Sequence, residues 1–96
     1  MPDADAFMRE RDRCVDRLRG MPLTRLPVSA ALAYAAANAL VDLTPDAAGR
    51  ALPRLADHAA GDQLAVVAAD LLASAPDASV LERATAILTE LRRSLP

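Results

Sequence analysis

Apolar residues recur every three or four positions toward the end of this sequence, and this stripe constrains the fold more than any other feature. Its members are Val80, Leu81, Ala84, Ile87, Leu88, Leu91 and Leu95. Because successive residues of an α-helix are about 100° apart, these side chains share a sector about 120° wide. The pattern predicts an amphipathic helix over 77–95 whose apolar side faces a core.

The composition extends this expectation to the whole chain. There are 23 alanines and 15 leucines, but only one phenylalanine, one tyrosine and no tryptophan. Alanine and leucine are among the strongest helix formers, whereas β-branched and aromatic residues favour strands. We therefore expect an all-α fold: a compact bundle of four to five antiparallel helices with an alanine- and leucine-rich core, forming a single domain over 1–96.

Apolar periodicity, prolines and capping residues divide the chain into helical segments joined by short loops. The expected helices lie at about 4–19, 28–43, 45–59, 62–73 and 77–95. Short loops favour antiparallel neighbours. Pro53 falls inside the third segment, where it either kinks the helix or splits it.

Two of these segments have few or no charges. Segment 28–43 carries no charge before Asp42, and alanines occupy nearly every side of it; segment 62–73 has Asp70 as its only interior charge. A helix that is apolar all round belongs in the middle of a bundle. We expect both segments to be central.

The third segment depends on its capping residues. Thr44, Pro45 and Asp46 offer a capping hydroxyl, a proline for the first turn and an acid at the positive end of the helix dipole. Gly61 and Asp62 would end this helix and begin the next. The side chains expected to face inward are Ala48, Leu52, Leu55, Ala56 and Ala59.

All 11 basic residues are arginines. The guanidinium group suits phosphate and carboxylate, but an excess of alanine, arginine and aspartate is also typical of a high-GC genome. Six of the arginines lie between positions 9 and 25, against three acidic residues. Arg9, Arg13 and Arg17 form a ridge on the first helix, which interleaved acids can neutralise.

The ridge leaves a nucleic-acid interface as an alternative, with the three guanidinium groups on phosphates. The net charge of −2, the pI near 5.2 and the two aromatic residues disfavour it. Arg11 projects from the apolar side of the same helix. It can extend to the solvent edge, meet a buried acid such as Asp70, or anchor an interface.

Catalytic residue types are scarce. His58 is the only histidine, and we interpret it as a surface or helix-end residue that favours the negative end of the third helix dipole. Cys14 lies on the apolar side of the first helix and is expected to be inert; a single cysteine forms no internal disulfide. No spacing suggests a metal site. We expect no cofactor, no metal and no enzyme activity, with a His58-dependent enzyme as the alternative.

Two patterns bear on location. Asp3 and Asp5 stand near the N-terminus, where no apolar run predicts a secretory signal. The uncharged stretch 26–41 is shorter than the roughly 20 residues that span a bilayer, and it contains Pro27 and Asn38. These features predict a cytoplasmic protein without a membrane segment.

By elimination, the sequence predicts a small non-enzymatic protein-interaction or regulatory module. Its partner is another protein or a second copy, and homodimerisation is the simplest version. The first and last helices are the expected contact surfaces. The candidate interaction residues are Arg9, Arg11, Arg13 and Arg17. The alternative is a nucleic-acid-associated factor that uses the arginine ridge.

Overall fold

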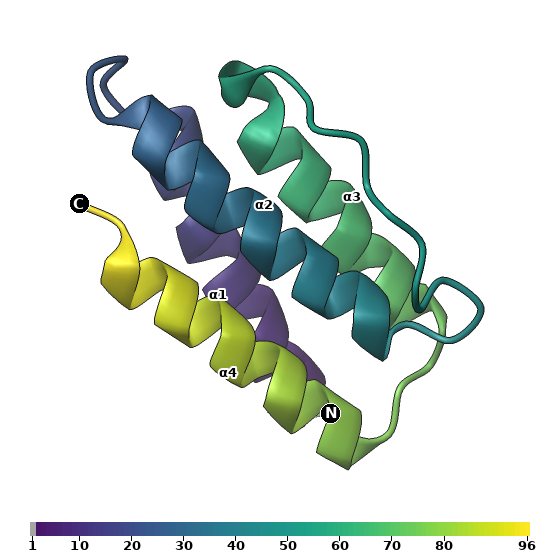
Figure 1. Cartoon of the computed structure of the whole chain (residues 1–96). Helices are drawn as coiled ribbons and strands as arrows, with labels where there is room; N and C mark the ends of the chain where they lie inside the picture. The colour runs from purple at the N-terminus through teal and green to yellow at the C-terminus, as the bar shows by residue number, and fades with distance from the viewer. Residues whose placement is uncertain (1) are drawn as a thin grey trace.

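The computed structural model describes residues 2–96 and contains four α-helices and one 3₁₀ turn (Figure 1). The helices are α1 (Pro2–Arg19), α2 (Leu26–Leu43), α3 (Ala60–Ala73) and α4 (Ala78–Ser94), and the 3₁₀ turn Asp57–Ala59 leads into α3. The all-α expectation is confirmed. The ends of these four helices differ by no more than two residues from the expected ranges.

The helix ends follow the chemistry of their residues. Asp3 and Asp5 occupy the first turn of α1 and Arg17 and Arg19 its last turn, which matches the sign of the helix dipole at both ends. The Asp77 side chain caps α4 by accepting a hydrogen bond of 2.9 Å from the Val80 N–H.

The expected helix over 45–59 is wrong. Residues 44–56 form turns and an extended loop instead. The Thr44 hydroxyl donates to the Leu40 carbonyl at 2.9 Å, so it closes α2 rather than opening a new helix. Asp46 and Gly49 then adopt left-handed backbone conformations, with φ of 63° and 85°. With these two residues and Pro53, no uninterrupted helix can form.

Side chains of the helices hold this loop against the bundle. The Tyr34 hydroxyl donates to the Leu52 carbonyl at 2.6 Å, and the Gln63 side chain donates to the Pro53 carbonyl at 2.9 Å. The loop therefore runs back along α2 and α3 (Figure 1). Because it returns the chain to the level at which α2 began, α3 runs parallel to α2.

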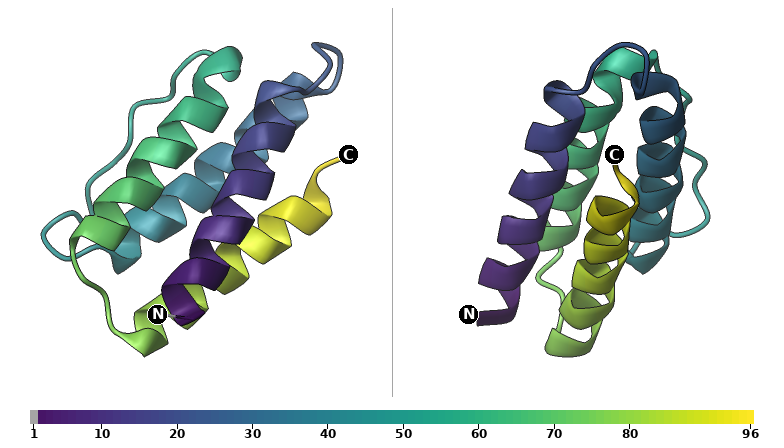
Figure 2. Two further views of the ribbon diagram at one scale, coloured as in Figure 1. Left: turned by 180° about the vertical axis from the view of Figure 1, so that it is seen from behind. Right: turned by 90° about the vertical axis from the view of Figure 1, so that its left-hand side faces the viewer.

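Each helix packs mainly on two others, and half of these pairs are parallel. The Cys14 thiol contacts the Leu88 carbonyl and Arg17 donates to the Leu95 carbonyl, so α1 and α4 run in the same direction. Gly61 at the start of α3 packs on Leu18 at the end of α1, which makes that pair antiparallel. α2 and α4 are antiparallel as well (Figure 2). The expectation of antiparallel neighbours therefore holds for two of the four packed pairs.

One core cluster draws on all four helices. Its largest fully buried side chains include Phe7, Leu40, Leu64, Leu71 and Leu88. The leucines of the α4 stripe face this cluster, as expected from the periodicity. Because the helices form a ring of four, every helix keeps one side on the surface. As expected for 28–43 and 62–73, α2 and α3 are the most buried helices, with 8 of 18 and 6 of 14 residues buried, but neither is enclosed in the middle of the bundle.

Candidate interaction surface

The outer side of α2 is apolar and exposed. Val28 is 70% exposed and Leu32 is 37% exposed. Ala31 and Ala35 are exposed beside them, at helical spacing. We call these four residues the apolar stripe. Large exposed apolar residues are ordinary when scattered singly, but a contiguous group marks a candidate contact surface.

The position of α2 in the ring explains the stripe. Ala33, Ala37 and Leu40 on the inner side of α2 belong to the core. No charged residue occurs in α2 before Asp42, so whichever side faces outward is apolar. By length and composition alone, α2 is also the one helix within residues 2–96 that could cross a membrane, a property that core helices share. Eight of its 18 residues are buried in the bundle.

A shallow groove lies beside the stripe, between α2 and α4. Its volume is about 480 Å³. The lining residues are Leu32, Ala35 and Ala36 from α2 and Ala86, Ile87, Glu90, Leu91 and Ser94 from α4. We call it the α2–α4 groove. Alanines on both walls leave the space open, and nearly all of the lining is apolar.

The charges near the groove lie along α4. Arg83 and Glu90 are exposed and are two helical turns apart, with Ile87 between them. Glu82 and Arg93 are exposed on the outer side of the same helix. No ion pair within residues 2–96 engages any of these four side chains. Their charges are therefore open to an external partner.

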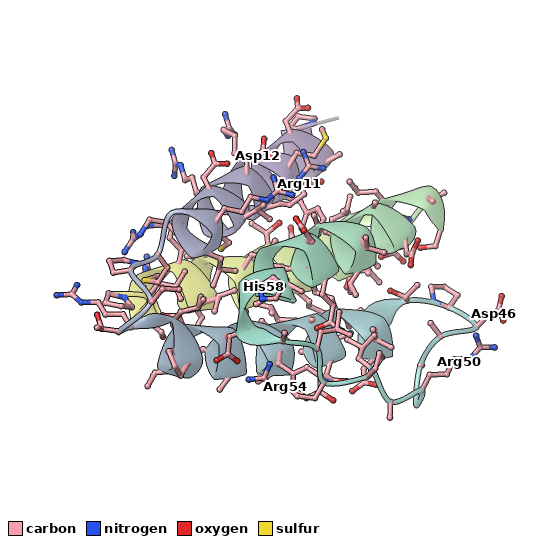
Figure 3. All side chains as sticks on the ribbon, turned by 90° about the horizontal axis from the view of Figure 1, so that it is seen from above. Arg11, Asp12, Asp46, Arg50, Arg54 and His58 are labelled. Atoms are coloured by element: carbon pink, nitrogen blue, oxygen red, sulfur yellow. The ribbon has the colours of Figure 1, made fainter. Side chains whose placement is uncertain are left out.

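The sequence-predicted arginines lie elsewhere, on α1, and three of the four have partners within the chain. Arg11 pairs with Asp12 at 2.9 Å, at the solvent edge rather than with Asp70 (Figure 3). Arg13 lies 3.9 Å from Glu10. Arg17 donates to the carbonyl oxygens of Leu95, at 3.1 Å, and Pro96.

The carboxylates of Asp12 and Glu10 offset part of the positive charge of Arg11 and Arg13. Arg13 and Arg17 line a hollow that also contains the Asp16 side chain. Arg9 is exposed on the same helix. An acid in the same hollow weakens the attraction of a phosphate to the ridge.

His58 is exposed and lies on the 3₁₀ turn before α3 (Figure 3). The exposure of His58 agrees with the surface interpretation, but because no α-helix covers 45–59, the expected position at a helix C-terminus is wrong. The acids near it in sequence have other partners: Asp57 pairs with Arg54 at 3.3 Å and Asp62 with Arg19 at 2.6 Å. Across the described residues, no three His, Cys, Asp or Glu side chains come together as metal ligands.

Cys14 is fully buried against α4, and its thiol donates to the Leu88 carbonyl at 3.2 Å. Burial raises the pKa of the thiol to about 11. Because the thiolate is the reactive form, this side chain is not placed to act as a nucleophile near neutral pH.

A second apolar hollow of about 350 Å³ lies between the loop and α3. Leu55 and Val66 are its most exposed apolar residues. Asp62, Gln63 and Asp70 also line it, as Glu90 and Ser94 line the α2–α4 groove.

Comparison of the chain with protein-family models, with curated proteins and with solved structures finds no match. The candidate surface therefore rests on the residues alone. Sequence reasoning did not identify Val28 or Leu32 as surface residues. The one sequence feature that distinguishes this surface is the absence of charge in 28–43, which predicts burial on every side. The core buries only one side of that helix, so the other side is exposed and apolar.

Proposed function

We propose that this protein is a small helical interaction module that binds another protein chain through the apolar stripe and the α2–α4 groove. One observation carries the proposal: Val28 and Leu32 are exposed beside a groove with an apolar lining. Fully burying a side chain such as valine or leucine contributes about 1.5–3 kcal/mol. Contact residues of this kind, seated at the centre of an interface, carry much of its binding energy.

The arginine ridge supports the alternative of phosphate binding less well. Arg13 and Arg17 already interact with groups of the same chain, and Asp16 lines the same hollow. An interface on nucleic acid would rest on arginines whose positive charge is partly compensated. The apolar stripe has no such compensation, because within residues 2–96 no other segment covers it.

The test compares two double variants with the same chemistry at two places. Val28→Gln with Leu32→Gln alters the stripe. Val66→Gln with Leu55→Gln replaces one exposed valine and one exposed leucine in the second hollow. Glutamine removes apolar surface without adding charge, and it is a good helix former.

Tagged wild-type protein and both double variants are captured from nuclease-treated lysate of cells that also contain the untagged chain. We expect the wild type and the Leu55 and Val66 variant to retain the same protein, including untagged copies, and the stripe variant to lose it. Equal retention by all three, or loss only in the Leu55 and Val66 variant, contradicts the proposal. So does wild-type protein that retains nothing, or that retains proteins only when nuclease is omitted.

A further inference from the structure

The charges on α4 point to a second copy of this chain as the partner. We infer that two copies form a two-fold dimer in which α2 and α4 of one copy face α2 and α4 of the other, with the two α4 helices antiparallel. This inference rests on the proposed function, because it uses the same surface and names its occupant.

The charges along α4 reverse in sign about the middle of the helix. Arg83 and Glu90 are equally far from the midpoint between Ala86 and Ile87. A two-fold axis through that midpoint places Arg83 of each copy opposite Glu90 of the other. In such an isologous contact every pair occurs twice. The same axis places the apolar Ala86 of each copy opposite Ile87 of the other at the centre.

The outer side of α4 repeats this reversal. The same axis brings Glu82 of one copy within two positions of Arg93 of the other, which long side chains can span. All four side chains are exposed, and none forms an ion pair within the described chain. A parallel arrangement would instead place each charge against its own kind. Charge therefore specifies the direction of the contact, and the two kinds of pair place the axis within one residue of the same point on α4.

The size of the face formed by α2 and α4 also fits a dimer. α2 and α4 have 18 and 17 residues, so the face that they form is about 26 Å long and about 20 Å wide. A corrugated helical surface has more accessible area than its outline. The smallest specific interfaces bury about 600 Å² on each partner. The face is therefore large enough for a dimer, though one at the small end of the range.

The experiment measures the mass of the purified, full-length protein in solution by sedimentation equilibrium. Arg83→Glu places four acids around the axis, and Glu90→Arg places four arginines there. Exchanging both residues together restores the complementary pairs. Arg50→Glu on the exposed loop is the control for a change of charge alone.

We expect a dimer for the wild type and for Arg50→Glu, and a dimer Kd raised about tenfold by either single exchange. The double exchange should return the Kd to the wild-type value, a result that a merely structural role of these residues would not produce. Val28→Gln with Leu32→Gln should also weaken the dimer. If neither the charge exchanges nor the stripe variant changes the dimer Kd, the dimer forms through another surface and the inference is overturned.

A monomer at about 100 μM overturns the inference too, and the capture experiment then tells which claim has failed. If the stripe variant still loses a protein that the wild type retains, the surface binds a different protein and the proposed function stands. If no variant changes the capture, both fail. Stripe-dependent co-sedimentation of the monomer with phosphatidylcholine and phosphatidylglycerol vesicles would instead assign the surface to a lipid.

Discussion

Arg92 on α4 donates to Glu10 on α1, with 2.7 Å between Nε and Oε2, and this contact joins positions 82 residues apart in the sequence. Both side chains are partly buried, and a second guanidinium nitrogen reaches the other carboxylate oxygen at 3.3 Å. The hydrogen bond from Arg92 is the main reason that the pKa of Glu10 lies below its ordinary value. The pair therefore fastens the two parallel helices mainly when Glu10 is ionised.

Acid should weaken this contact in a defined direction. Because the pKa of Glu10 is lower in the folded protein than the 4.5 of the free side chain, the folded state binds fewer protons between those two values. The pair stabilises the protein fully above pH 4.5, and this contribution is lost as the pH falls through the folded pKa. Glu10→Gln should thus cost most at neutral pH, with a difference from wild type that shrinks in acid.

Urea denaturation from about pH 7 down to about pH 3 measures this difference. Asp70→Asn, at an exposed acid on α3, is the matched control for loss of a carboxylate. A cost of Glu10→Gln that is constant over this range would show that the ion pair does not contribute to stability.

The sequence predicted the amphipathic helices well and the connection between α2 and α3 badly. α1 and α4 place apolar residues on one side only, so their boundaries and their buried sides follow from periodicity. Thr44 and Asp46 are residue types that occur at the start of a helix, at the end of a helix and in turns. Their identity alone therefore did not decide whether a helix begins there. In the structure, the Thr44 hydroxyl donates a hydrogen bond to the Leu40 carbonyl at the end of the preceding helix.

The candidate surface could not be predicted for a related reason. A helix with apolar residues on every side has no amphipathic direction, so sequence does not say which side faces solvent. Which side of α2 faces solvent depends on where the loop over 44–56 places α3. Tyr34 and Gln63 hold the loop along α2 and α3, which leaves Val28 and Leu32 uncovered on the other side of α2.

Tyr34→Phe should loosen the loop without disturbing the bundle. The variant loses the hydrogen bond to the Leu52 carbonyl but keeps the ring, over which the Arg54 guanidinium lies at 5.4 Å. A hydrogen bond of this type contributes about 1 kcal/mol. Amide hydrogen exchange in 44–56 should therefore become faster, by up to about fivefold, while exchange in α4 is unchanged. Equal acceleration in α4 would mean that the loop does not open separately.

Two buried hydroxyls should respond to removal in opposite ways. Within residues 2–96, the Ser29 hydroxyl has no hydrogen-bond partner, whereas that of Thr44 donates to the Leu40 carbonyl. Ser29→Ala should be neutral or raise the free energy of unfolding by up to about 1 kcal/mol, because an unpaired buried polar group is costly. Thr44→Val keeps the shape and should lower the free energy of unfolding by about 1 kcal/mol. Urea denaturation at neutral pH compares the two. A loss in Ser29→Ala equal to that in Thr44→Val would reveal a partner for Ser29.

Cys14 should react only when the protein opens. With a pKa of about 11, about one thiol in a thousand is ionised at pH 8, and the side chain has no exposed surface. A disulfide reagent such as dithionitrobenzoate should therefore label the unfolded protein in concentrated urea at least a hundredfold faster than the native protein. Native labelling at the unfolded rate would place the thiol on the surface and contradict its contact with Leu88.

Gly61 is the second residue of α3 and packs on the end of α1, where the sequence suggested the end of one helix and the start of the next. A Cβ at this position would lie 3.3 Å from the Arg19 Cγ and 3.5 Å from the Leu18 Cβ. Arg19 is an exposed, flexible side chain, so a shift of a few tenths of an ångström can relieve the contact. Because alanine is favoured over glycine in a helix by about 1 kcal/mol, Gly61→Ala should leave the melting temperature equal or slightly higher.

Gly61→Leu should act in the opposite direction. A side chain of that size has no space between the two helices, and overpacking of this kind costs about 1–3 kcal/mol. Separation of α1 from α3 would also disturb the Arg19 and Asp62 pair, which lies beside Gly61. Circular dichroism at 222 nm gives both melting temperatures. If leucine is tolerated as well as alanine, α1 and α3 are not held at this distance, and the close approach at Gly61 does not fix their packing.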